Sequence, residues 1–220
     1  MYFPFTVCAP HEGTSVANRF DLSANRGNMA GTRRNRFLLS AVYDVPVGKN
    51  RKFLSHMNRI SDLALGGWSV STVNLWETGP YLTPTTSSSF DPGNLNLSSR
   101  GSLQRPDCIG NGNVANAATG SMFNIAAFNP IPEGPVGNCG VGILEGPGTA
   151  TIAAGLSKAF HLTERMRMRL ESTFTNLFNH PNFAPPPMNV TSSSFGIVQS
   201  VQSAENSGNR TSQVSLRLDF

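Results

Sequence analysis

The last ten residues of the chain, 211–220, constrain its fold more than any other stretch. They read Thr-Ser-Gln-Val-Ser-Leu-Arg-Leu-Asp-Phe, so apolar and polar side chains alternate strictly from Val214 to Phe220. A period of two places Val214, Leu216 and Leu218 on one face of a β-strand and the polar residues on the other. An apolar strand face must be covered, either by a protein core or by the hydrocarbon of a bilayer.

The composition favours strands and long loops over helices. Only 14% of the residues are charged, against roughly 25% in soluble domains, while the chain holds 21 glycines and 15 prolines. No run of apolar residues is long enough for a membrane-spanning helix. The net charge of +4 includes basic clusters at 33–36 and 49–52. Because no nucleic-acid recognition motif accompanies them, we expect no nucleic-acid partner.

Four more stretches alternate in the same way. They lie at 37–45, 68–78, 149–160 and 166–177, and a weak helical pattern occupies 52–64. In the last of the four, the sequence Arg-Met-Arg-Met-Arg-Leu-Glu repeats its charges every two residues, which excludes an amphipathic helix. The sequence therefore predicts an all-β chain, an antiparallel meander of about five long strands.

The clearest of these strands, at 166–177 and 211–220, have one apolar and one polar face, whereas in 68–78 Thr72 and Asn74 lie between Trp68 and Trp76 and weaken the lipid-facing interpretation of that strand alone. If the apolar faces meet lipid, the opposite faces line the lumen of a barrel. The lipid-facing candidates are Met168, Leu170, Phe174, Val214, Leu216 and Leu218. The lumen-facing candidates are Arg167, Arg169 and Glu171. Lys158 falls on an apolar face near a strand end, where its long stem can carry the ammonium group to the membrane surface.

The connections between the predicted strands alternate between shorter and longer. Those at 79–148 and 178–210 are long and rich in Ser, Asn, Gly and Pro, whereas the one at 161–165 is a short turn. In a meander, alternate connections lie at the same end of the sheet, so both long ones are expected on one side. This is the asymmetry of an outer-membrane barrel, which has short periplasmic turns and long extracellular loops.

Residues that carry catalysis or bind metals form no recognisable motif. The histidines lack the spacing of a metal site, and no Gly-x-Ser-x-Gly sequence marks a nucleophilic serine. We therefore expect neither an enzyme nor a bound cofactor. Cys108 and Cys139 lie in similar Gly- and Asn-rich sequence, which fits a loop disulfide in an oxidising compartment and equally fits two free thiols. The state of Cys8 is open.

Several short strings follow one another along the chain. They are Gly-Trp-Ser-Val-Ser at 67–71, Arg-Pro-Asp at 105–107, Gly-Pro-Gly at 146–148, Leu-Ser-Lys at 156–158, Asn-Leu-Phe-Asn-His-Pro-Asn-Phe at 176–183 and Leu-Arg-Leu-Asp-Phe at 216–220. Together they resemble the C-terminal end of TonB-dependent outer-membrane receptors, in particular the Oar-like branch that carries an N-terminal carboxypeptidase-regulatory-like domain. The resemblance extends over residues 30–220.

The resemblance implies a barrel of about 22 strands with long extracellular loops in the cell outer membrane. A plug domain would fill its lumen, a periplasmic energy-coupling protein would drive import of an unidentified solute, and outer-membrane lipid would surround it. Phe220 would be the signal that the barrel-assembly machinery reads. Residues 36–220 would be the C-terminal portion of the barrel, and residues 1–35 an N-terminal loop segment.

The chain also departs from the family pattern. It shows no plug, coupling box or signal segment, and Ala153 stands where the family usually has an acidic residue. Closed single-chain barrels have about eight strands or more. We therefore expect an incomplete piece of a transmembrane barrel that is not competent for transport alone.

Two other classes of protein share part of these features. A secreted adhesion or glycan-binding module could hide the same apolar faces inside a β-sandwich, but sandwich strands have about 5–6 residues and frequent turns. An outer-membrane hydrolase could use His180, which lies near a Ser-rich loop. We favour a polar strand end as the explanation of the surroundings of His180.

Overall fold

A computed structural model describes residues 23–49, 51–87, 104–113, 120–161, 166–203 and 208–220. They fall into two compact units. The sheet unit comprises residues 34–78, 148–184 and 200–220, and the loop unit comprises residues 1–33, 79–147 and 185–199.

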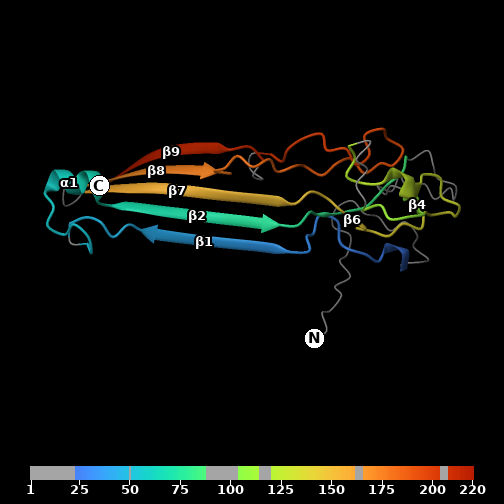
Figure 1. Cartoon of the computed structure of the whole chain (residues 1–220), viewed down its shortest axis with the longest axis horizontal. Helices are drawn as coiled ribbons and strands as arrows, with labels where there is room; N and C mark the ends of the chain where they lie inside the picture. Colours follow the sequence, from blue (N-terminus) through green and yellow to red (C-terminus); the bar gives the residue numbers. More distant parts are fainter. Residues whose placement is uncertain (1–22, 50, 88–103, 114–119, 162–165, 204–207) are drawn as a thin grey trace, which may run out of the picture. The chain divides into compact units, whose positions relative to one another are not determined.

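The sheet unit is built on five long strands in the order β1-β2-β7-β8-β9 (Figure 1). The strands are β1 (Arg36–Asp44), β2 (Trp68–Glu77), β7 (Thr149–His161), β8 (Arg167–Thr175) and β9 (Thr211–Asp219). Every neighbouring pair is antiparallel, and the long strands follow one another in the sheet as they do in the chain. The predicted all-β meander is therefore confirmed, with strand ends close to those expected.

The connections leave the sheet at alternate ends. Glu77 pairs with Thr149 and Thr175 pairs with Thr211, so both long connections begin and end at the same end of the sheet. The helix α1 (Arg59–Leu65) lies in the connection at the other end, where the C-terminus is also found (Figure 1). Its N-cap Asn58 accepts a hydrogen bond from the backbone N of Ser61, which explains why the helix begins there.

Both outer strands of the sheet have one unpaired edge. β1 pairs only with β2 and β9 pairs only with β8, so within the described residues the sheet is open. Every residue of β1 is exposed. A bilayer core offers no hydrogen-bond partner to an unpaired strand edge, so a membrane-spanning sheet of this kind needs further strands on both sides.

The sheet unit has no protein core on either face. Among the described residues, the buried hydrophobic side chains all belong to the loop unit. On β1, Phe37 on one face is 57% exposed and Val42 on the other face is 74% exposed. A soluble β-sandwich would cover one face with a second sheet, and no such layer packs on these strands in the described part of the chain.

The loop unit takes its residues from both long connections. Its regular elements are the paired strands β3 (Tyr81–Leu82) with β6 (Leu144–Glu145) and β4 (Asp107–Cys108) with β5 (Phe128–Asn129), and the 3-10 helices η1 (Ser23–Asn25) and η3 (Ile125–Ala127). Backbone hydrogen bonds join the two connections, from Thr85 N to Met188 O at 2.9 Å and from Val190 N to Thr85 O at 2.8 Å.

A small aromatic core holds the loop unit together. The Phe195 ring lies 5.6 Å from that of Phe128 in an edge-on arrangement and 6.1 Å from that of Phe123. Leu144 and Val190 complete this core, with Cys139. The described parts of 79–147 and 185–199, expected to be irregular, therefore form one folded body, because their scattered apolar residues are buried against each other.

This arrangement divides the chain differently from the predicted boundary between 1–35 and 36–220. The loop unit interrupts the sheet unit twice in sequence. Of the predicted N-terminal segment, residues 1–22, including Cys8, lie outside the described residues. Residues 26–33 belong to the loop unit, to which they are joined by the bridges of Gly27 with Val141 and of Arg33 with Pro80.

Candidate functional surfaces of the sheet

The register of the strands places the aromatic residues together. Cross-strand partners in an antiparallel sheet project from the same face, and the pairs Phe37–Trp76 and Met168–Leu218 therefore mark one face of the sheet. We call it the aromatic face, because it carries every aromatic residue of the five strands. These are Phe37, Tyr43, Trp68, Trp76, Phe160 and Phe174. Every lipid-facing candidate also lies on this face.

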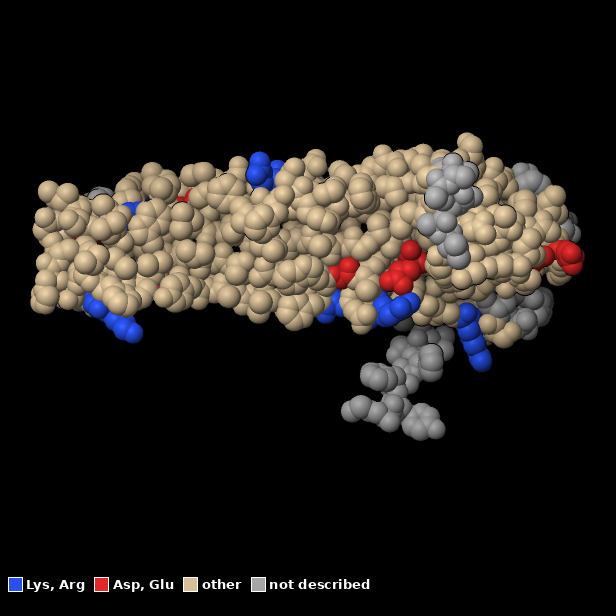
Figure 2. Space-filling model, viewed as in Figure 1, with Lys and Arg blue, Asp and Glu red and all other residues tan. Residues whose placement is uncertain are grey.

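The opposite face, here called the charged face, carries every charged residue of the five strands except Lys158. These are Arg36, Asp44, Glu77, Arg167, Arg169, Glu171, Arg217 and Asp219. The structure thus brings the three lumen-facing candidates together, on the side away from the aromatic rings. Charged residues are sparse over the strands in the view of Figure 2.

The charged side chains of β8 and β9 pair along their own strands. Arg169 Nη1 lies 3.6 Å from Glu171 Oε1, and Arg217 Nε lies 2.8 Å from Asp219 Oδ1. Arg169 is the cross-strand partner of Arg217. Each guanidinium group therefore has a carboxylate on its own strand, which offsets the repulsion between the two cations. All four side chains remain exposed.

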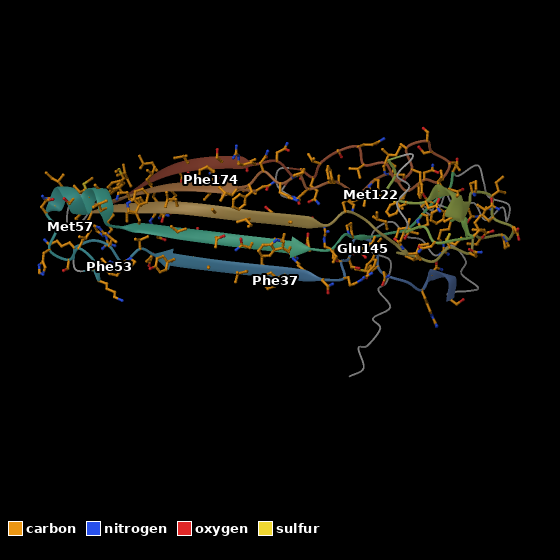
Figure 3. All side chains as sticks on the ribbon, in the orientation of Figure 1. Phe37, Phe53, Met57, Met122, Glu145 and Phe174 are labelled. Carbon is orange, nitrogen blue, oxygen red and sulfur yellow. A yellow bond between two sulfur atoms is a disulfide. The ribbon has the colours of Figure 1, made fainter. Side chains whose placement is uncertain are left out.

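Aromatic residues gather toward both ends of the aromatic face. Phe37 and Trp76 pair near one end with ring centroids 5.6 Å apart, while Trp68 begins β2 at the other end. From Trp68 to Trp76 the strand rises about 26 Å. At a tilt of about 40° this is about 20 Å of height, close to the roughly 25 Å apolar band between the aromatic girdles of an outer-membrane barrel. Phe174 lies between these ends (Figure 3).

Thr72 and Asn74 lie between the two tryptophans of β2 on the aromatic face, which also carries Ser172 and Ser212. Thr72 Oγ1 donates a hydrogen bond to the backbone O of Ala153 at 3.1 Å, and its contact with Asn74 Oδ1 is 3.4 Å. Asn74 is only 8% exposed. Because their polar atoms turn toward the sheet, Thr72 and Asn74 do not present an open polar patch on this face.

Lys158 behaves differently from the expectation that it extends to the membrane surface. Its side chain is buried, and its Nζ donates to the backbone O of Ala64 at 2.8 Å and of Gly66 at 2.9 Å. The ammonium group also lies 4.4 Å from the Trp68 ring centroid. It is held by the carbonyls at the C-terminal end of α1, where a cation is favourable. The sequence showed only that this charged residue falls on the aromatic face, and it did not indicate the carbonyl partners.

The Arg-Pro-Asp string at 105–107 organises the loop unit. Arg105 Nη1 donates to Cys139 O at 2.8 Å, and the Asp107 carboxylate accepts from Glu133 N at 2.8 Å and Asn138 N at 2.7 Å. Burial lowers the pKa of Arg105. A disulfide joins Cys108 to Cys139, the alternative that the sequence left open against free thiols. The string and the disulfide therefore fix the same segment, 133–139.

The Asn-Leu-Phe-Asn string forms the turn that ends β8. Asn176 and Asn179 both adopt a left-handed backbone, with φ of 50° and 53°. The Asn176 side chain donates to His180 O at 2.7 Å and to Gly208 O at 2.9 Å, and it accepts from His180 N at 3.0 Å. The string therefore has a structural explanation, because it ties the end of β8 to the approach of β9.

His180 lines a groove of about 550 Å³ at the end of the sheet. The groove also contains Arg36, Glu77 and Thr149 but no serine or cysteine that could act as a nucleophile. Among the described residues, no three His, Cys, Asp or Glu side chains are grouped as a metal site requires. The hydrolase alternative thus gains no support from the surroundings of His180.

Long antiparallel strands with an exposed aromatic face and an opposite charged face define a wall segment of an outer-membrane β-barrel. The family model of the outer membrane beta barrel domain matches residues 7–213, and the chain belongs to this family. The protein is thus located in the outer membrane. Neither the curated proteins nor the solved structures contain a significant match. Among the described residues, no helix has the length and apolar character needed to cross a membrane.

Proposed function

We propose that this chain forms part of the barrel wall of a TonB-dependent receptor that imports a solute across the outer membrane. Family membership supports a barrel in that membrane. The finer assignment rests on the ordered strings from Gly67 to Phe220 that resemble such receptors. The solute is not identified by any feature of the chain.

The observation that carries the proposal is the separation of side chains between the two faces of an uncovered sheet. Large apolar residues such as Leu39 and Val214 are exposed to 48% and 68%, and no protein layer covers them in the described part of the chain. Hydrocarbon is the solvent in which such a face is favourable, so the aromatic face contacts lipid and the charged face lines the lumen.

The proposal requires partners for the open edges and the charged face. Further strands pair with β1 and β9 until the barrel closes at about 22 strands. A plug domain in the lumen contacts the charges around Arg169 and Glu171, and a periplasmic energy-coupling protein acts on that plug. Neither nucleic acid nor catalysis has a role in this function.

The loop unit lies on the extracellular side in this proposal. Long connections of outer-membrane barrels are extracellular, and short ones are periplasmic. The disulfide between Cys108 and Cys139 suits that oxidising environment. A folded loop body with its own core offers a stable surface for the first contact with a solute.

Solute uptake tests the proposed function. Two strains are compared with their parent, one lacking the gene for this chain and one lacking the energy-coupling protein, and the depletion of small solutes from a defined medium is followed by mass spectrometry. We expect at least one solute to be retained in the medium by both strains. If every solute that depends on the coupling protein is still taken up without this chain, the transport proposal is wrong.

A further inference from the structure

The connection between β1 and β2, residues 45–67, has an exposed apolar surface of its own. Ile60 is 79% exposed, and Leu54, Phe53 and Leu65 are each more than half exposed. Phe53 and Met57 are labelled in this connection in Figure 3. Several large apolar side chains exposed on one short connection mark a candidate interaction surface.

Three hydrogen bonds place α1 on the side of the aromatic face. Lys158 Nζ donates to the carbonyls of Ala64 and Gly66, and Trp68 Nε1 donates to the Ala64 carbonyl at 3.1 Å. Because Lys158 and Trp68 project from the aromatic face, the C-terminal end of α1 lies over the end of that face and away from the charged face.

The rest of the connection is folded back on α1. Asp62 Oδ1 accepts from Lys49 N at 2.7 Å, and Gly66 N donates to Asp62 O at 2.8 Å. Phe53 N donates to Pro46 O at 3.0 Å, which closes the loop before the helix. The exposed apolar residues are therefore carried by an ordered segment.

The charge of the connection complements an anionic surface. It contains the four basic residues Lys49, Arg51, Lys52 and Arg59 but only one acidic residue, Asp62. Basic and apolar side chains in one amphipathic segment are typical of polypeptides that lie in a membrane interface, where phosphates meet the acyl chains.

We propose that residues 45–67 dock into the headgroup region of the phospholipid leaflet and anchor the barrel wall on that side. This inference rests on the proposed lipid contact of the aromatic face, because the docking surface continues that face beyond the strand ends. Ile60 and its apolar neighbours enter the leaflet, the basic side chains meet the lipid phosphates, and Lys158 with Trp68 holds α1 against the wall.

Photo-crosslinking in the outer membrane tests this docking. The photoreactive residue p-benzoylphenylalanine replaces Ile60, Leu156 on the aromatic face, or Val42 on the charged face, each in the full chain, and phospholipid adducts are detected by mass spectrometry after irradiation. We expect adducts at positions 60 and 156 and none at position 42. Adducts at 156 without any at 60, or crosslinks from 60 to protein alone, overturn the docking and leave the lipid contact of the sheet intact.

The two proposals fail in distinguishable ways. Absence of lipid adducts at position 156 overturns the proposed lipid contact of the aromatic face, whether or not adducts form at position 60. The anchor itself is tested with Lys158→Met, which removes the donor to both α1 carbonyls. We expect adducts at position 60 to decrease while those at 156 persist, which also shows that the variant is assembled. Unchanged adduct formation at 60 contradicts the role of Lys158.

Discussion

Leu156 and Ser157 are neighbours near the middle of β7, and the register places them on opposite faces of the sheet. Leu156 lies between Val70 and Ser172 on the aromatic face, whereas Ser157 lies beside Glu171 on the charged face. The two positions therefore form a matched pair. In the proposed orientation, the same substitution contacts lipid at position 156 and water at position 157.

We predict that Leu156→Arg lowers the free energy of unfolding by about 2–4 kcal/mol, the cost of an arginine near the bilayer midplane. Ser157→Arg is expected to leave it nearly unchanged, because the new guanidinium group meets water and the Glu171 carboxylate. Denaturant titration of the barrel reconstituted in phospholipid vesicles, followed by tryptophan fluorescence, measures both. Equal losses for the two variants would contradict the assignment of the faces.

Phe220 is almost fully exposed at the end of the chain. We propose that Phe220 is the signal for the barrel-assembly machinery, as the resemblance to TonB-dependent receptors implies. Phe220→Ala is then predicted to lower the fraction of the protein that reaches the outer membrane in assembled form. Phe220→Tyr, which keeps the ring, is the control and is expected to assemble normally. The assembled fraction is measured by heat-modifiable migration of the membrane fraction. Normal assembly of the alanine variant would contradict the role of Phe220 as an assembly signal.

Single residues were predictable from sequence only where their neighbours in the chain define their environment. The faces of Met168 and Arg169 follow from alternation alone. The partners of Lys158 could not be predicted, because they are backbone carbonyls of a helix far away in sequence. Every residue has a backbone carbonyl, so the residue types do not indicate which ones are bound. The same holds for Arg105, which binds the Cys139 carbonyl.

At the scale of single elements, the end of β8 depends on Asn176. This residue is buried, has a left-handed backbone and makes side-chain hydrogen bonds to two segments. Left-handed backbone costs a non-glycine residue about 1–2 kcal/mol, a cost that the Asn176 hydrogen bonds offset.

We predict that Asn176→Ala lowers the free energy of unfolding by about 2–4 kcal/mol, because it removes the side-chain donor to the buried Gly208 carbonyl and strains the turn. Asn176→Gly loses the same hydrogen bonds but tolerates the positive φ, so it is expected to cost about 1–2 kcal/mol less. The same vesicle titration compares the two. A glycine variant less stable than the alanine variant would show that the backbone conformation is not what this position requires.

The long strands were predictable because each one carries its own period-two pattern, as in Arg-Met-Arg-Met-Arg-Leu-Glu at 165–171. The loop unit was not, since its core joins Phe123 and Phe195 from different connections without any periodicity between them. The pairing of Cys108 with Cys139 likewise depends on how residues 104–139 fold, and the sequence left free thiols as an equal alternative.

For the molecule as a whole, the proposed contact of the aromatic face with hydrocarbon explains the open sheet and its uncovered side chains together. The open edges of β1 and β9 require further strands. The uncovered apolar side chains require a lipid solvent. Both requirements are met at once if the five strands are part of a larger closed barrel in the outer membrane.

A spin-label scan along β7 tests whether the aromatic face contacts hydrocarbon. In the full chain with Cys8→Ser, each residue from 151 to 157 is replaced in turn by a labelled cysteine, and collision with oxygen and with a water-soluble nickel chelate is measured in the outer membrane. We predict that oxygen accessibility peaks at Ile152, Ala154 and Leu156 and nickel accessibility at the residues between them. Low oxygen accessibility at all three positions, or oxygen maxima at the residues between them, would show that the aromatic face does not contact hydrocarbon.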